Sequence, residues 1–337
     1  MLSAILPKIK QLDFVQVEKT KVIELVQEKK LNYNLQALRG ILAIIVLLNH
    51  SLGFQNYLDP HFYSNFVDSI QPRGQLRVFV FFILSGYVIG ISNKKPLDSK
   101  NILPFLKKRF VRLYPIYFIG ILIAILLATT TYSYQTIAAN FTYTQFLFAD
   151  IIHENSPMWS LQYEVFYLLL FIPISYFRIN PLLIAFTSIF IGLLNYFLNP
   201  VLGIPILSSY AFGMVFWSFG LILSKYLSTS NREINYPFMI GLIILLFYIY
   251  KLNIFSVGLY EAAKLFNFSS ILFNESVNWY NRAVTLADFT FLPYCGMFII
   301  VFAGANFKFK NHIFSILLVL PLFALFFSAN EFSKSDT

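Results

Sequence analysis

Long apolar stretches recur along this chain, and they constrain its fold more than any other feature. A helix needs about 20 apolar residues to cross the hydrocarbon core of a bilayer. With 58% hydrophobic residues, 12% charged residues and a mean hydropathy of +0.67, the chain is too apolar for a soluble globular domain. Nine stretches have the character of membrane spans: Leu35–Phe54, Leu76–Ser92, Leu113–Thr131, Ser160–Phe177, Pro181–Leu198, Pro205–Lys225, Pro237–Ile254, Phe289–Ala305 and Ile313–Ser328.

These stretches favour one kind of membrane fold. Backbone groups cannot stay unpaired in hydrocarbon, so a spanning segment is either a helix or a strand of a closed barrel. The apolar runs lack the alternating pattern of barrel strands. The sequence therefore predicts an all-α, polytopic helical membrane protein with about nine to ten transmembrane helices.

The net charge of +9 is explained by topology rather than by a nucleic-acid partner. Of the 25 Lys and Arg residues, 19 lie on one side of the alternating spans: seven before or at the start of the first, seven between the second and third, and five beside later even-numbered loops. The other loops hold six. The positive-inside rule then places the N-terminus of this multi-pass membrane protein in the cytoplasm.

Three parts of the chain follow from these spans. Residues 1–34 form a cytoplasmic N-terminal segment, in which Asp13–Lys30 has the pattern of an amphipathic helix that lies on the bilayer or binds a partner. Residues 35–328 form the transmembrane domain, and residues 329–337 a short tail. We find no secretory signal peptide before the first span, so we expect that span to act as an uncleaved anchor. The single cysteine, Cys295, cannot form an internal disulfide.

Two ionisable side chains in the first span are candidates for chemistry, because such groups are costly inside a membrane. Arg39 and His50 are eleven residues apart, which on a helix is about three turns, so both project from one stripe about 16 Å apart along the axis. A phosphorylated donor with a long reactive arm, such as a coenzyme A thioester, suits this arrangement, with His50 as general base. The alternative is an interfacial arginine and a histidine that serves packing.

Arg109 and Arg112 begin the third span and share a helix face at positions i and i+3. Guanidinium groups match phosphate oxygens in a bidentate manner, so this pair is a candidate phosphate site. Lys107 and Lys108 stand beside them. The alternative is therefore an ordinary cluster of cations at a cytoplasmic boundary.

Glu164 lies about one turn inside the fourth span, and the predicted topology places it at the depth of His50, near the outer face. There it would orient His50 or accept hydrogen bonds from a sugar hydroxyl, unless it is an interhelical polar contact. Ser85, beside Gly86 in the second span, is assigned to close helix packing rather than to nucleophilic catalysis. The remaining histidines show no spacing for a shared metal ion, so we predict no metal site.

Four segments together resemble acyltransferase family 3, a family of membrane O-acyltransferases: Ala37-Leu-Arg-Gly40 leading to His50, Phe82-Ile-Leu-Ser-Gly-Tyr87, Arg109-Phe-Val-Arg-Leu-Tyr-Pro115 and Met158-Trp-Ser-Leu-Gln-Tyr-Glu164. They occur in the order and with the spacing of the family, and they cover about the first half of the chain. The second half resembles the family as a run of spans.

The resemblance implies an enzyme that takes an acyl group, expected to be acetyl, from cytoplasmic acyl-CoA. The acceptor it implies is a hydroxyl of an extracytoplasmic glycan such as lipopolysaccharide O-antigen, peptidoglycan or exopolysaccharide. His50 matches the catalytic position, with Arg39 essential beside it, and Arg109 and Arg112 match the paired-arginine motif. Acyl-CoA is then a substrate, and no permanently bound cofactor is expected.

The chain differs from the family pattern in two respects. We count nine spans where the family has ten, and we find no late Ser-x-Ser-Tyr-like stretch that leads to a histidine. Two alternatives therefore stay open. One is a polytopic glycan or lipid carrier that forms no covalent bond, and the other is an inactive, shortened relative.

Overall fold

The computed structural model describes residues 33–53, 75–197, 206–229, 241, 245, 254–265 and 284–304. All regular elements in these ranges are helices, which confirms the all-α prediction for this part of the chain. In chain order they are α2 (Tyr33–Gly53), α5 (Gln75–Ser92), α6 (Ser99–Leu127), α7 (Tyr134–Phe141), the 3-10 helix η2 (His153–Met158), α8 (Trp159–Tyr176), α9 (Pro181–Phe197), α10 (Ile206–Thr229), α12 (Ile254–Leu265), the 3-10 helix η5 (Leu286–Phe291) and α14 (Leu292–Gly304).

Most predicted spans coincide with these helices. Helices α2, α5, α8, α9 and α10 begin and end within a few residues of the first, second, fourth, fifth and sixth predicted spans. The eighth predicted span is divided between η5 and α14. Residues 1–32, the last predicted span and nearly all of the seventh lie outside the described residues.

Two described helices are long and apolar enough to cross a bilayer, Ser99–Leu127 and Ile206–Leu227. Four shorter apolar helices accompany them: Leu35–Ile44, Leu76–Ser92, Pro181–Asn195 and Asp288–Ile300. A membrane protein of the helical class fits this set of helices.

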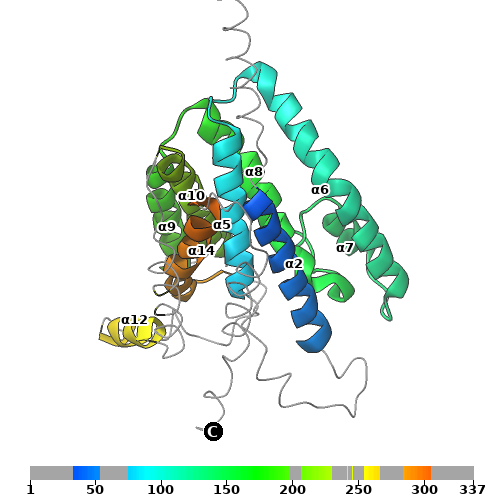
Figure 1. Ribbon diagram of the computed structural model, residues 1–337. Helices are drawn as coiled ribbons and strands as arrows, with labels where there is room; N and C mark the ends of the chain where they lie inside the picture. Colours follow the sequence, from blue (N-terminus) through cyan, green and yellow to red (C-terminus); the bar gives the residue numbers. More distant parts are fainter. Residues whose placement is uncertain are drawn as a thin grey trace, which may run out of the picture.

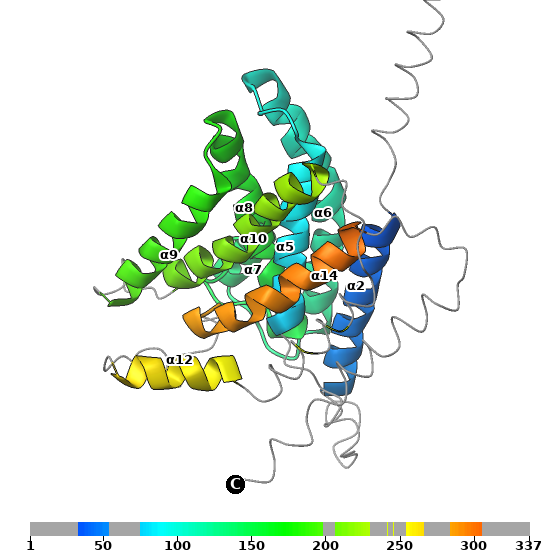
Figure 2. The same cartoon turned by 60° about the vertical axis from the view of Figure 1, so that its left-hand side comes forward.

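The core of the molecule forms where α10 crosses α5, with α14 packed against both helices and α9 packed against α10 (Figures 1 and 2). The crossing is close because glycines face backbone. A Cβ added to Gly86 would lie 2.0 Å from the carbonyl oxygen of Trp217, and one added to Gly220 would lie 2.1 Å from that of Ile83. This contact is closer than any side chain allows, so the small-residue packing predicted around Gly86 is confirmed.

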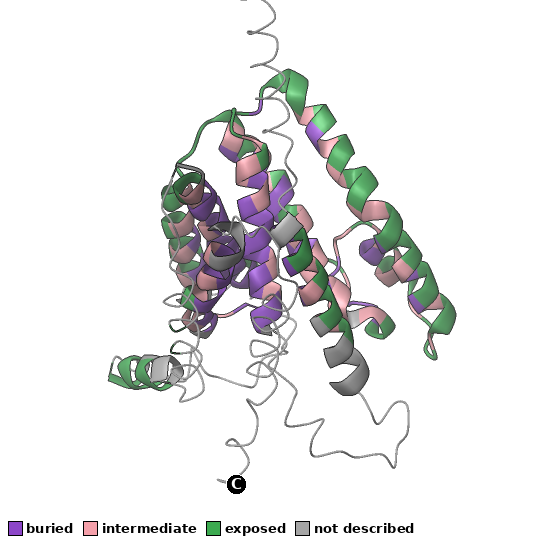
Figure 3. Cartoon of the chain, viewed as in Figure 1, coloured by how far each residue is buried: buried purple, intermediate pink, exposed green. Residues whose placement is uncertain are grey.

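Helix α6 stands at the edge of this core and is mostly exposed (Figure 3). It begins at Ser99, capped by the side chain of Asp98, which accepts a hydrogen bond from the backbone N–H of Asn101 (2.9 Å). The helix therefore begins well before Leu113, the first residue of the third predicted span. With 29 residues, α6 is about 43 Å long, longer than a bilayer crossing needs.

Both predicted outer loops contain helices. The first, Tyr132–Met158, holds α7 and η2, and the second, Phe255–Asp288, begins inside α12. Helix α12 lies apart from the core, and its described side chains are exposed (Figure 3).

Candidate active site

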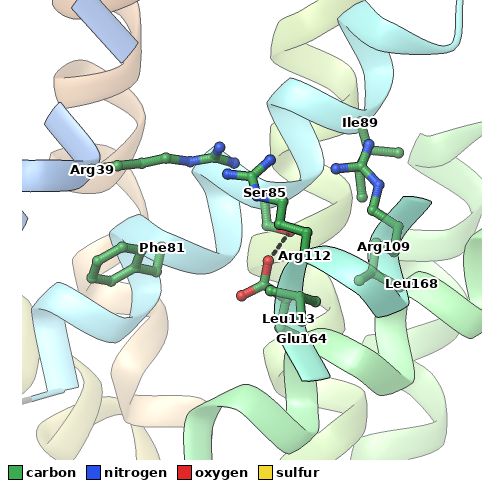
Figure 4. Close-up of a pocket in the computed structure, with 9 residues that line it drawn as sticks. All are labelled: Arg39, Phe81, Ser85, Ile89, Arg109, Arg112, Leu113, Glu164 and Leu168. Atoms are coloured by element: carbon green, nitrogen blue, oxygen red, sulfur yellow. Dashed lines mark hydrogen bonds between the residues drawn. The ribbon is translucent and has the colours of Figure 1, made fainter. Parts of the chain in front are cut away.

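A cavity of about 170 Å³ opens between α2, α5, α6 and α8. Its described lining contains four of the candidate site residues predicted from the sequence: Arg39, Arg109, Arg112 and Glu164. The residues that line it are Arg39, Phe81, Ser85, Ile89, Arg109, Arg112, Leu113, Glu164 and Leu168 (Figure 4).

The three arginines reach this cavity from two helices. Arg109 and Arg112 lie one turn apart on α6, and both line the cavity, which confirms that they share a face. Arg39 extends to it from α2, and its guanidinium lies beside that of Arg112 in Figure 4. The Arg109 guanidinium lies 5.6 Å from the ring centroid of Phe105, and its Nε is buried without a hydrogen-bond partner among the described residues.

The charges around the cavity do not cancel. Three guanidinium groups and one carboxylate leave a formal net charge of +2 on its lining. Arg39 is repelled by Arg112 and Arg109 and attracted by Glu164. Such an excess of positive charge in one cavity favours a bound anion. A buried guanidinium nitrogen without a partner also favours a ligand that accepts hydrogen bonds.

Glu164 lies with the arginines, and its predicted depth is corrected by this arrangement. The sequence placed it at the level of His50, whereas the structure places its carboxylate in the cavity that Arg39 lines. Arg109 and Arg112 of α6 line the same cavity, so the Glu164 carboxylate lies among groups from α2 and α6.

Arg39 and His50 both belong to α2, which continues without interruption from Tyr33 to Gly53. The helix places the two positions about three turns and about 16 Å apart along its axis. The side chain of His50 lies outside the described part of the structure.

Ser85 has a role that the sequence did not reveal. Its Oγ donates a hydrogen bond to Oε1 of Glu164 (2.9 Å), and both residues line the cavity (Figure 4). One sequence signal was available: Phe81, Ser85 and Ile89 recur at intervals of four residues on one face of α5, and Ser85 is the polar member of that stripe.

The first outer loop folds back against α6 and α8, beside this cavity. The ring of Tyr143 stacks on Tyr117 of α6 at 4.0 Å between centroids, and the hydroxyl of Tyr117 donates to the carbonyl oxygen of Asn140. The side-chain amide of Gln162, two residues before Glu164 on α8, donates to the carbonyl oxygen of Gln145. The loop is therefore tied to α6 and α8, two of the three helices that carry the cavity's charged groups.

Comparison with known proteins supports the interpretation of these residues. No curated protein and no solved structure matches the chain. A family model described as an acyltransferase domain matches residues 32–334, which include every helix described above. The match extends through the second half of the chain, where the motifs themselves gave no signal. The chain belongs to acyltransferase family 3, whose members are generally embedded in membranes.

Proposed function

We propose that this protein transfers an acyl group, with acetyl as the expected case, from cytoplasmic acyl-CoA to a hydroxyl of an extracytoplasmic glycan. The observation that carries the proposal is the cavity in which Arg39, Arg109 and Arg112 converge beside a single carboxylate. The family match supports the reaction class. The structure adds a site whose charge suits the phosphates of coenzyme A.

The donor's anionic head would bind among the three guanidinium groups. Bidentate hydrogen bonds from guanidinium to phosphate are stronger than neutral ones and fix the orientation of the group. At about 170 Å³, the cavity has the volume of about five or six water molecules in the liquid. That space suits phosphate groups, while the adenosine of the donor would lie outside it.

The reactive end of the donor would lie further along α2. His50 is about 16 Å from Arg39 along the helix axis, and the flexible arm of coenzyme A would cover that distance. His50 removes the proton of the acceptor hydroxyl as the hydroxyl oxygen attacks the thioester carbonyl. The carbon–sulfur bond then breaks, and the coenzyme A thiolate leaves and takes up a proton.

An insertion in α2 tests this arrangement while it keeps every side chain. One alanine inserted between Val46 and Leu47 rotates His50 by about 100° relative to Arg39. A control insertion between Ser51 and Leu52 leaves the register of Arg39 and His50 unchanged. We expect the first insertion to abolish acylation and the control to retain most of it.

The measurement is mass spectrometry of the surface glycans from a deletion strain that carries each variant, with the amount of membrane-inserted protein checked in parallel. The wild-type gene should restore the acyl mass increment. If the Val46–Leu47 insertion inserts normally and acylates at the wild-type rate, the proposed pairing of Arg39 and His50 is wrong. If the deletion changes no acyl group and no acyl-CoA is consumed, a carrier function replaces the enzymatic one.

A further inference from the structure

The hydrogen bond between Ser85 and Glu164 lies in the middle of the charged cavity, yet it joins neither residue to an arginine. Within the described residues, the hydrogen-bond partner of the Glu164 carboxylate is the hydroxyl of Ser85, 2.9 Å away. Figure 4 shows the three guanidinium groups on the same side of that carboxylate as the Ser85 hydroxyl. A carboxylate near three arginines has stronger partners within electrostatic reach than a neutral hydroxyl, so its position needs an explanation.

The backbone that carries Ser85 is held firmly. Gly86, the next residue, lies so close to α10 that an added Cβ would be 2.0 Å from the carbonyl oxygen of Trp217. Gly220 repeats this contact from the opposite helix, against the backbone of Ile83 and Tyr87. Ser85 itself is 4% exposed. Because two backbones lock together here, the Ser85 hydroxyl offers Glu164 a fixed partner.

Glu164 competes with an anionic ligand for the same cations. Its charge attracts both Arg39 and Arg109, and a carboxylate binds a guanidinium with the same bidentate geometry as a phosphate. If the carboxylate turned from Ser85 towards the arginines, it would occupy the N–H groups that a phosphate needs. Its charge also repels a phosphate from wherever it stands.

We infer that Ser85 is a positioning residue that keeps Glu164 from pairing with the arginines, and that Glu164 lowers the affinity of the cavity for coenzyme A. The inference rests on the proposed function, because it takes the phosphates of coenzyme A as the ligand. It gives Glu164 a part in turnover. Donor and product carry the same phosphates, so a site without this carboxylate would bind the spent coenzyme A more tightly and release it more slowly.

The test is the affinity of the purified protein, in lipid nanodiscs, for coenzyme A itself, measured by isothermal titration calorimetry. Ser85→Ala should weaken binding about tenfold, since Glu164 then turns to the arginines and a charge-assisted contact is lost. Glu164→Gln should tighten binding at least about threefold, because one negative charge is removed. In the Glu164→Gln background, Ser85→Ala should change the affinity by less than about twofold.

Two further variants separate positioning from packing. Ser218→Ala removes an equally buried hydroxyl from α10, one that donates to the carbonyl oxygen of Val215 (3.0 Å), and it should bind as the wild type does. Ser85→Thr keeps the hydroxyl and should restore most of the affinity lost in Ser85→Ala. If Ser85→Ala fails to fold, the affinity of Glu164→Gln for coenzyme A, compared with that of the wild type, still tests whether the carboxylate lowers the affinity.

Each outcome has one meaning. If the wild type binds no coenzyme A, the proposed function fails. If the wild type binds coenzyme A, Ser85→Ala is tested with Glu164 and again in the Glu164→Gln variant. An equal loss of affinity in both would mean that the serine serves packing, and the inference would be overturned. The inference is also overturned if Glu164→Gln binds coenzyme A more weakly than the wild type, since the carboxylate would then support the arginines rather than compete with the ligand.

Discussion

Helices α10 and α6 are the two long apolar helices of the described structure, and they are built in opposite ways. In the most apolar part of each helix, 78% of α10 is buried inside the protein, whereas 17% of α6 is buried. Helix α10 packs backbone to backbone on α5 through Gly220 and Gly86. Helix α6 touches the rest of the molecule through a few side chains, such as Phe105 against Phe171 of α8, and through the loop that follows it.

The difference separates the scaffold from the ligand-binding groups. Ser85 stands on the tightly packed pair α5 and α10, so its position is set by the core. Arg109 and Arg112 stand on the peripheral helix α6, where long side chains have room to adjust to a phosphate. We therefore expect substitutions at the crossing to act on stability and those on the inner face of α6 to act on affinity.

The largest effect should come from Gly220→Ala at the crossing. The new Cβ would lie 2.1 Å from the carbonyl oxygen of Ile83 and 2.7 Å from the backbone nitrogen of Tyr87, so the helices must move apart. We expect a loss of more than about 2 kcal/mol of stability, measured as the thermal midpoint of the purified protein in detergent. Gly258→Ala on the exposed α12 is the matched control, because an added Cβ there meets nothing within 4 Å. Equal midpoints for the two variants would contradict a tight crossing.

The next largest effect concerns the inner face of α6. Arg109→Ala and Arg112→Ala should each weaken the binding of coenzyme A by about 1.5–3 kcal/mol, the value of a hydrogen bond to a charged group, with little change in thermal midpoint. Lys108→Ala controls for the loss of a cation from an exposed position of the same helix, and it should change the affinity far less. If all three variants bind coenzyme A with the same affinity in a titration, these cations set the membrane topology and do not bind the donor.

The helices of this protein could be predicted largely from its apolar stretches, but the way in which they pack against one another could not. The segment Leu76–Ser92 gave α5 to within one residue, because an apolar run bounded by polar residues fixes both ends of a helix. The start of α6 was missed because its first turns carry lysines and prolines. Those residues are typical of loops, yet they are tolerated here on a helix whose outer face is exposed.

The candidate site was predicted as a set of residue types and not as a geometry. Arg39, Arg109 and Arg112 follow from motifs and helical spacing, since each lies on the face that its register predicts. The meeting of Glu164 with Arg39 depends on how α8 lies relative to α2, and the bond from Ser85 depends on how α5 lies relative to α8. Both are tertiary contacts, and the periodicity of residues within one helix does not predict how separate helices pack. The predicted base, His50, stays a prediction.

The smallest effect should come from the loop that follows α6. The hydroxyl of Tyr132 accepts a hydrogen bond from the backbone N–H of His153 (3.0 Å) and donates one to Oε2 of Glu154. It thereby joins the start of the loop to its end. Because the pair is exposed, Tyr132→Phe should cost less than about 1 kcal/mol at neutral pH, well below the effect of Gly220→Ala.

This last contact should depend on pH in a defined direction. The hydrogen bond from Tyr132 lowers the pKa of the Glu154 carboxyl below its ordinary value, so the stabilisation is fully present above about pH 4.3, the ordinary value for glutamate, and is lost as the pH falls through the lowered value. In Tyr132→Phe, the pKa of Glu154 should rise towards the ordinary value, which an NMR titration of ¹³C-labelled glutamate carboxyls would measure. The difference in thermal midpoint between variant and wild type should shrink below that pH. An unchanged pKa of Glu154 in the variant would show that Tyr132 does not hold the end of the loop.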